Sequence, residues 1–370
     1  MKNTLQIGIN EKFNASLLFF IICAAQVGVG VHGFQAVIYQ NAKHDAWISI
    51  IISFLAVNLL MIVTFKLLEM YESNDIFGIN LDIFGKYIGN FINLLLVLYC
   101  GAAFFAIIRN YTDVINAWVF PELKPSFIVI TLLILVIYAF TAGLRIIIGI
   151  CFFSFFLGLW IPIALLLPLD YANVNYLLPV FSNDLIDILK GAYYMSFTIV
   201  GFEVIHVLYP FVKEKKKAKK YVHLGLLFTM VLYLFVMIIT LTFFSGEQLE
   251  KTIWATLSLF SIIRLPFLER IELITICFWM IVILPNLCLY AWSAYRGFQR
   301  IAPIKETKFI LIFSLLIFIA SFFVETRTQI HAFNYTFGTL AFYIVLVYPI
   351  FMYFIALIKK SALKHRARRE

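Results

Sequence analysis

Two polar stretches interrupt long apolar runs of this 370-residue chain, and their residue types favour ligand binding over catalysis. The first is QVGVGVHGFQ, residues 26–35, and the second is YYMSFTIVGFEVIHVLYP, residues 193–210. Glycines leave backbone N–H and C=O groups uncovered, and the carboxylate of Glu203 can accept hydrogen bonds or hold a cation. Because the loops show no nucleophile–base–acid spacing and no metal-ligand cluster, we predict a non-enzyme with no catalytic residues, no metal and no cofactor.

The three glycines of the first stretch allow two interpretations. They can let membrane helices pack closely, as in G-x-x-x-G faces, or they can leave backbone groups free to line a ligand pocket. The second stretch favours the pocket, because it also places small and polar residues in the middle of an apolar run. A phenylalanine from LYCGAAFFAIIRN could close that pocket. The predicted ligand-binding residues are Gly28, Val29, Gly30, Val31, Phe105, Ser196, Thr198, Gly201, Phe202 and Glu203.

Glu203 is the most informative single residue of the set. An ionisable group near the bilayer centre costs at least about 2.5 kcal/mol, so it needs a partner or a function. Two roles stay open from the sequence. Glu203 either receives the cationic group of a ligand or is paired internally with His32, His206 or Arg109.

Composition identifies the setting of these residues. The chain is 63% hydrophobic and only 13% charged, with a mean hydropathy of +0.96, whereas soluble domains carry about 25% charged residues. We therefore predict an all-α integral membrane protein, because about 20 apolar residues cross a bilayer as a helix. Ten transmembrane helices are expected, at 15–40, 46–68, 88–116, 126–142, 144–168, 188–211, 221–244, 271–297, 308–324 and 335–358.

The two polar stretches fall in the first and sixth of these spans. Interrupted helices five spans apart are typical of a five-plus-five inverted repeat whose broken helices 1 and 6 face a cavity at the membrane midplane. We predict a single transmembrane domain over 1–370, with one repeat at about 15–168 and the other at about 188–358. The fourth and fifth spans should divide at Thr141-Ala142-Gly143.

Lysine and arginine gather on one side of this topology. The positive-inside rule places KEKKKAKK after the sixth span and the basic tail at 359–370 in the cytoplasm, together with both termini. The loop at 69–87 is acidic although it falls on the same side. Anionic lipid headgroups explain the net charge of +9, so we predict contact with membrane lipids and none with nucleic acid. The N-terminal sequence does not resemble a cleavable signal peptide.

Other features bear on mechanism. The loop at 245–270 is apolar for an external loop, and we expect it to form a helix that either covers the cavity mouth or docks a partner subunit. Pro285-Asn286 should kink the eighth span, either for packing alone or to leave an acceptor free. The eighth span has no Ser/Thr pair in its middle and the fifth has no lysine, so ion coupling is unsupported.

Five stretches resemble the B subunits of spore germinant receptors, within the amino acid, polyamine and organocation transporter superfamily. They are GVGVHG, FGKYIG, NVNYLLPVF, SFTIVGFEV followed by KEKKKAKKY, and IWATLSLFSIIRLPFLERIE. Their order and spacing resemble the family over residues 15–358. The family often has a proline shortly after the first break, where this chain has Gln35.

The resemblance implies a ten-helix protein of the spore inner membrane that senses a nutrient germinant. It implies a complex with a larger membrane A subunit and a lipoprotein C subunit. The pocket would bind an amino acid, sugar or nucleoside and trigger germination. A secondary transporter that uses the same cavity, such as an amino acid permease, is the competing interpretation.

Overall fold

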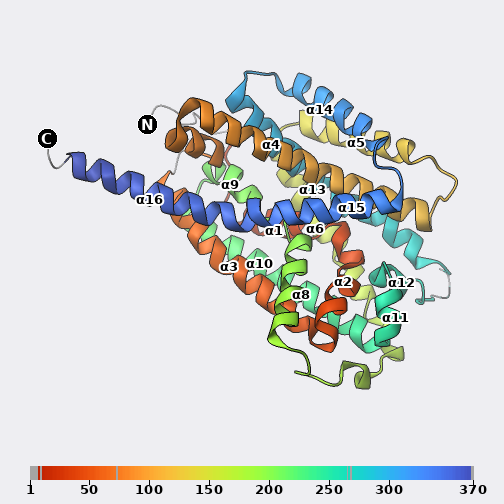
Figure 1. Cartoon of the computed structure of the whole chain (residues 1–370). Coiled ribbons are helices and arrows are strands. Elements are labelled where there is room, and N and C mark those ends of the chain that lie inside the picture. Colours follow the sequence, from red (N-terminus) through yellow and green to blue (C-terminus); the bar gives the residue numbers. More distant parts are fainter. Residues whose placement is uncertain (1–6, 9–10, 72–73, 265, 267–268, 368–370) are drawn as a thin grey trace.

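The computed structural model describes residues 7–8, 11–71, 74–264, 266 and 269–367. Within those ranges the chain is almost entirely helical, and the only strand-like contact is an isolated bridge between Phe13 and Val212. The α-helices are α1 Leu17–Gln26, α2 Phe34–Ala42, α3 Ala46–Met70, α4 Ile76–Trp118, α5 Pro125–Thr141, α6 Leu144–Gly158, α7 Trp160–Ala164, α8 Leu185–Thr198, α9 Ile205–Leu208, α10 Lys215–Phe243, α11 Gly246–Lys251, α12 Ala255–Phe260, α13 Ile271–Ile301, α14 Glu306–Ser321, α15 Arg327–Ala341 and α16 Tyr348–Ala367 (Figure 1).

Six helical segments of the described chain are long and apolar enough to cross a membrane. The pair Leu185–Thr198 and Phe202–Phe211, bent by 54°, adds a seventh if it forms one span. Helices α1 and α5 are apolar but shorter. Helical structure falls on every predicted span, which confirms the all-α membrane fold, while the count of ten spans stays a prediction.

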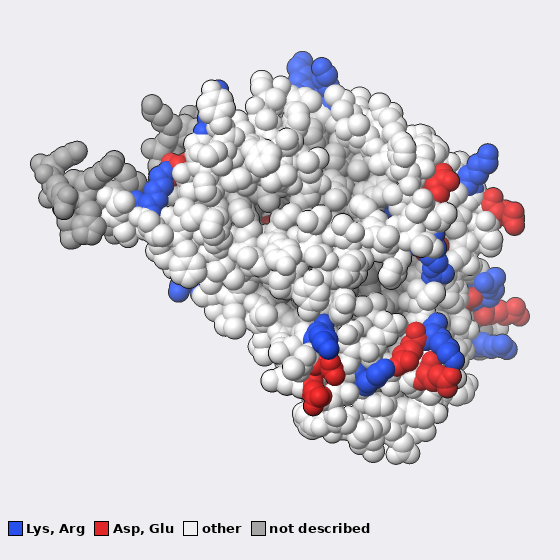
Figure 2. Space-filling model, viewed as in Figure 1, with Lys and Arg blue, Asp and Glu red and all other residues white. Residues whose placement is uncertain are grey.

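The surface agrees with a membrane setting. Large apolar side chains are exposed on the outer helices, including Leu59, Leu98, Ile134 and Phe354, where a soluble protein would place polar groups. Figure 2 shows that charged residues on this face gather towards the ends of the molecule and leave the middle nearly free of charge.

Both predicted helix breaks are present. Helix α1 ends at Gln26, a short 3₁₀ turn covers Val29–His32, and α2 begins at Phe34. In the sixth span α8 ends at Thr198, Gly201 adopts a positive φ of 124°, and a 3₁₀ turn follows at Phe202–Val204. The predicted turn at Thr141-Ala142-Gly143 is also confirmed, because α5 ends at Thr141 and Gly143 has a φ of 89° before α6 begins.

The loop predicted at 69–87 is largely helical instead. Helix α4 begins at Ile76, and a bend at Gly85, with φ 76°, separates its first turns from the predicted third span. Asp75 caps this segment by accepting a hydrogen bond from the Gly78 N–H at 2.8 Å. A helix cap and buried partners therefore order residues that hydropathy alone assigns to a loop.

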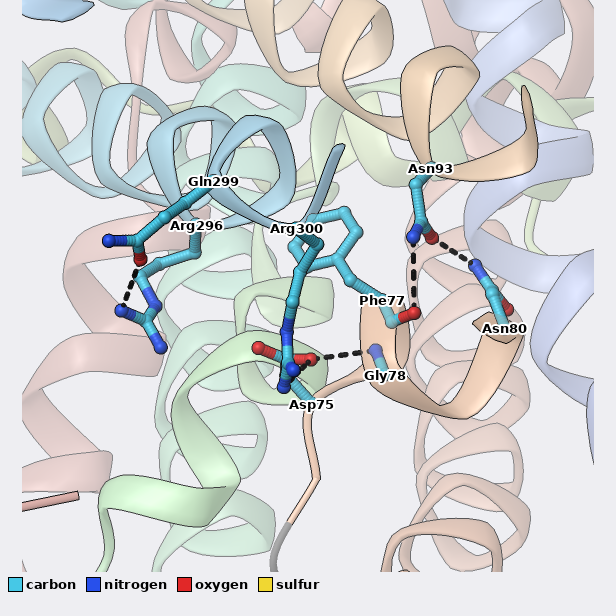
Figure 3. A network of polar contacts seen from close by, with 8 residues as sticks. All are labelled: Asp75, Phe77, Gly78, Asn80, Asn93, Arg296, Gln299 and Arg300. Carbon is cyan, nitrogen blue, oxygen red and sulfur yellow. Dashed lines mark hydrogen bonds and ion pairs between the residues drawn. The ribbon is translucent and has the colours of Figure 1, made fainter. Parts of the chain in front are cut away.

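A polar network holds this segment to the rest of the protein at the end of the molecule that also carries the end of α16 (Figures 1 and 3). We call this the termini-side end. Buried Asp75 forms an ion pair with Arg300 at 3.1 Å. Lys359 from α16 pairs with Asp82 at 3.1 Å. The predicted basic tail at 359–370 thus begins inside α16, which continues to Ala367.

The opposite end has its own anchor. Asp45, fully buried between α2 and α3, accepts hydrogen bonds from the backbone N–H groups of Phe181, Ser182 and Asn183 at 2.6, 2.9 and 3.0 Å. Burial alone would raise the pKa of the Asp45 carboxyl, but these donors hold that pKa below its ordinary value. One carboxylate therefore fixes the segment that leads into α8.

We predict that Asp45→Asn lowers the melting temperature of the detergent-solubilised protein by a few °C, equivalent to about 2 kcal/mol, because three backbone donors lose a charged acceptor. Since the folded-state pKa is lowered, the stabilisation is complete above about pH 4 and is lost as the pH falls through the folded-state pKa. Asp187→Asn is the control, because the Asp187 carboxylate pairs with exposed Lys190 on the surface of α8. Equal melting temperatures for the two variants would contradict this role.

Candidate ligand site at the two helix breaks

The two breaks lie directly against each other. A Cβ atom placed on Gly201 would lie 2.1 Å from the carbonyl oxygen of Ala25, and one on Gly30 would lie 2.8 Å from Cγ2 of Thr198. Real Cβ atoms do not approach other atoms so closely. Both glycines therefore permit close packing, and this packing brings the first break into contact with the second.

Gln26 connects the breaks by hydrogen bonds. Its side chain, 1% exposed, donates from Nε2 to the carbonyl of Ile199 at 2.9 Å and accepts from the Thr229 hydroxyl at 2.6 Å. The Tyr233 hydroxyl donates to the Gln26 carbonyl at 2.9 Å. One residue at the end of α1 thus links the second break to α10.

Other carbonyls of the first break also have side-chain partners. The Asn286 side chain donates to the Val27 carbonyl at 3.2 Å, and the Thr256 hydroxyl donates to the Val31 carbonyl at 2.8 Å. A helix that ends inside a membrane protein leaves carbonyls that must be satisfied, and here other helices supply the donors. A ligand that binds these carbonyls would therefore compete with protein side chains for the same acceptors.

Glu203 is held by two tyrosines. Its Oε1 accepts hydrogen bonds from the hydroxyls of Tyr99 at 2.6 Å and Tyr290 at 2.8 Å, and its Oε2 accepts one from the Gly201 N–H at 2.6 Å. The prediction of internal pairing with His32, His206 or Arg109 is wrong as to the partners. Tyrosine hydroxyls satisfy this half-buried carboxylate without a second charge.

The three expected partners have other contacts. His206 Nδ1 lies 2.9 Å from the backbone carbonyl of Glu203, and Arg109 donates to the carbonyl of Glu325 at 3.3 Å. His32 is fully buried, with its ring centroid 4.2 Å from that of Trp279. Neither ring nitrogen of His32 has a hydrogen-bond partner among the residues described here.

The remaining candidates divide between the breaks and the core. Val29, Phe202 and Ser196 are buried within or beside the breaks, and the Ser196 hydroxyl donates to the carbonyl of Tyr193 at 2.5 Å. Phe105 packs against Phe333 of α15, with ring centroids 5.1 Å apart. It lines neither of the cavities described next.

Each of two cavities borders one break. The first contains about 650 Å³ of empty space, part of it open to the surroundings, and lies beside Val27 and Val31 among apolar side chains of α6, α7, α10 and α13. The second contains about 480 Å³, also partly open, and is lined by Glu203 and by residues of α4, α9, α13 and α16. The structure thus separates the polar groups of the second break from the apolar space beside the first.

The segment at 245–270 covers the first break. Helix α12 is buried, and its Thr256 bonds to the Val31 carbonyl and accepts a hydrogen bond from Gln35 Nε2 at 2.5 Å. A Cβ atom on Gly33 would lie 2.4 Å from the carbonyl oxygen of Ile253 in the same segment. This contact places the segment against the first break, and its expected role as a cover over the cavity mouth or as a docking surface for a partner subunit stays a prediction. Residues 265, 267 and 268 lie outside the described chain.

Sequence reasoning did not single out Gln26, Tyr99, Tyr233 or Tyr290 as site residues. The sequence does indicate Gln26 as a site residue, since it is a polar residue at mid-span just before the glycines. It does not indicate the tyrosines, because 19 tyrosines are spread along the chain and their hydroxyls find these partners only through packing of distant helices.

Two helices that are interrupted at mid-length and packed against each other at their breaks are typical of one class of membrane transporter folds. A Na⁺-coupled sialic acid symporter in its substrate-bound, outward-open state has the same fold, with a TM-score of 0.67 over 91% of this chain and 78% of the symporter chain. The two sequences are 10% identical, so the likeness concerns the fold alone.

Within that class the chain belongs to the spore germination protein family, whose model matches residues 12–330. It is 34% identical to spore germination protein GerQB of Bacillus cereus, over 93% of this chain and 95% of the relative. It is 23% identical to spore germination protein A2 of Bacillus subtilis (strain 168), over 94% and 96% of the two chains. These matches confirm the family expected from the motifs.

We predict that Gly201→Ala destabilises the protein by about 3 kcal/mol, because the new methyl group meets the Ala25 carbonyl and the backbone keeps a positive φ. The measurement is the yield of monodisperse protein and its melting temperature in detergent. Gly149→Ala, in α6 with no atom within 4 Å of the new Cβ, is the control and should be neutral or stabilising. If Gly201→Ala matched that control, the close contact between the breaks would be refuted.

Proposed function

We propose that this chain is the nutrient-sensing membrane subunit of a spore germination receptor. A small molecule, an amino acid, sugar or nucleoside, would bind where the two breaks meet. The contacts proposed from the sequence are the backbone from Gly28 to Val31 and the segment from Ser196 to Glu203, with Phe105 nearby. Membership of the germination family supports this role, and the joined breaks supply a site that ligand binding can rearrange.

The observation that carries the proposal is the side-chain capping of the break carbonyls. Gln26, Asn286, Thr256 and Tyr233 donate to these carbonyls in the structure described. A nutrient with its own donors would replace some of these side chains and so favour a second arrangement of α1 and α8. The free energy available for signalling is the difference in the nutrient's affinity for the two arrangements.

The proposed setting follows the family resemblance and the charge pattern. The chain would lie in the spore inner membrane, with both termini on the cytoplasmic side, because basic segments gather at the termini-side end. A larger membrane A subunit and a lipoprotein C subunit would be its partners. The cover formed by α11 and α12 is accessible to such a partner at one side, since Glu247 and Lys251 of α11 are exposed.

A secondary transporter is the second candidate, because the fold is shared with a solute symporter. Uptake of radiolabelled amino acids, sugars and nucleosides into vesicles that contain this chain alone separates the two candidates. We expect no more accumulation than in protein-free vesicles, because a receptor subunit would signal to its partner subunits and would not carry the nutrient across the membrane. Robust accumulation without any partner subunit would replace the receptor with a transporter.

A pair of substitutions tests whether the Gly30 backbone contacts the nutrient. We predict that Gly30→Ala raises the nutrient concentration for half-maximal germination at least tenfold, with normal protein levels by immunoblot. Its methyl group would meet Cγ2 of Thr198 at 2.8 Å, whereas the next Thr198 atom lies at 3.6 Å. Thr198→Ser removes the clashing methyl group and should restore packing in the double variant.

The double variant decides the cause. If the backbone of Gly30 meets the nutrient, the response stays weak although thermal stability recovers, because the alanine methyl group still covers the site. Thr198→Ser alone serves as the control. A normal response in the double variant would show that Gly30 matters only for packing and would remove it from the ligand site.

A further inference from the structure

The second cavity has an arrangement of polar groups that the family match does not explain. It lies on the termini side of the second break. Phe77, which lines it, lies beside the network of Asp75 and Arg300 in Figure 3, and Tyr348, which also lines it, bonds to Asn80 of the same segment. Polar lining residues come from four segments: Tyr99 from α4, Glu203 and His206 from the turns after the second break, Tyr290 and Ser293 from α13, and Tyr348 from α16, whose hydroxyl donates to Asn80.

These groups form two pairs at helical spacing. Glu203 and His206 are three residues apart, as are Tyr290 and Ser293, so each pair lies on one side of its turn. The hydroxyls of Tyr99 and Tyr290 are already committed as donors to Glu203 Oε1. These two tyrosine hydroxyls are therefore not free to donate to a ligand, and Ser293 is the cavity residue whose hydroxyl has no described partner.

His206 adds an acceptor. Its Nδ1 lies 2.9 Å from the carbonyl oxygen of Glu203, and a carbonyl can only accept, so Nδ1 carries the proton. In the neutral imidazole Nε2 is then the acceptor. The side chain is 5% exposed, and Nε2 has no partner in the described part of the chain.

Ser293 is a second group without a partner. It is 2% exposed, and its hydroxyl bonds to no described protein atom, although a helical serine can usually bond back to its own helix. A buried hydroxyl that makes no internal hydrogen bond costs free energy. Two such unsatisfied groups beside one carboxylate indicate a ligand with donors.

The carboxylate selects the charge of that ligand. Tyr99 and Tyr290 hold Glu203 between α4 and α13 through their hydroxyls. A carboxylate attracts cations and repels anions. An uncharged sugar would find acceptors here, but it would gain nothing from the negative charge.

We propose that this cavity binds a primary ammonium group, with Glu203 as counter-ion and with His206 Nε2 and Ser293 Oγ as hydrogen-bond acceptors. The inference rests on the proposed function in one respect: of the three nutrient classes proposed there, an ammonium site favours a nutrient that carries an amino group, such as an amino acid. Binding of an ammonium group by this cavity does not depend on the sensing role, and it is tested on the chain directly.

The test uses the full chain in nanodiscs of phosphatidylcholine, which lacks the net negative charge that would bind the probe elsewhere. Binding of n-propylammonium chloride is measured by saturation-transfer NMR at constant ionic strength. We expect saturable binding by the native chain and much weaker binding of tetramethylammonium, which has the same charge but no N–H donors. Equal binding of the two ions, or equally effective competition by potassium, would overturn the proposal of an ammonium site.

Variants locate the site. Ser293→Ala should weaken n-propylammonium binding about tenfold through the loss of one hydrogen bond to a charged group. It should not unfold the protein, because the hydroxyl makes no internal hydrogen bond. Ser314→Ala is the matched control: Ser314 is also buried without a described partner, but it lies on α14 outside the cavity. Equal losses in both variants, or none in either, would overturn the assignment.

Glu203→Gln keeps an acceptor for the tyrosine hydroxyls and removes the charge, but its amide nitrogen would face the Gly201 N–H whose hydrogen bond Oε2 of Glu203 accepts. The variant should abolish saturable n-propylammonium binding, and its melting temperature in the nanodisc checks that it is folded; retained binding would contradict the role of Glu203. The two proposals fail separately. If n-propylammonium binds but spores with this chain respond only to nutrients without an amino group, the sensing role needs another ligand site. If spores respond to an amino acid while the isolated chain shows no Ser293-dependent binding, the ammonium site is refuted and the sensing role survives.

Discussion

The need to satisfy backbone carbonyls where helices are interrupted inside a membrane shapes the centre of this protein. Water cannot reach such groups in hydrocarbon, so each must find a donor within the protein. The donors come from helices distant in sequence: Tyr233 of α10 and Asn286 of α13 bond to the end of α1, and Gln26 reaches across to Ile199. Hydrogen bonds therefore couple the two breaks to each other and to α10 and α13. A change in the conformation of one break is expected to alter the hydrogen bonds that it shares with the other break and with these helices.

Close approach makes these bonds possible. Gly201 lies where any side chain would collide with the backbone of α1, and its positive φ turns the chain towards Glu203. That carboxylate bonds back to the Gly201 N–H and outward to tyrosines of α4 and α13. A single acidic group thus stabilises the break and gives the cavity below it a negative charge. The half-buried carboxylate is tolerated at this depth because three donors converge on it.

The two ends of the molecule are held differently from its centre. At the termini-side end, the ion pairs Asp75–Arg300 and Lys359–Asp82 tie the start of α4 to α13 and α16. At the opposite end, Asp45 holds the segment before α8, and α12 covers the first break through Thr256. Ion pairs and carboxylate contacts at the ends, around a centre held by hydrogen bonds between uncharged side chains and carbonyls, are compatible with both a receptor and a transporter. The family matches favour germination, and the fold alone favours neither.

Local sequence determined much of this architecture. Apolar runs placed the helical segments, glycines and polar residues at 26–35 and 193–210 placed both breaks, and Gly143 placed the turn between α5 and α6. These features depend on neighbours along the chain, which a sequence displays directly. Only the tertiary structure decided that tyrosines rather than His32, His206 or Arg109 bind Glu203, that Phe105 packs away from both cavities, and that residues from Ile76 form a helix. Such outcomes depend on which distant helix supplies a donor at hydrogen-bonding distance, and hydropathy and spacing along one chain carry no information about that choice.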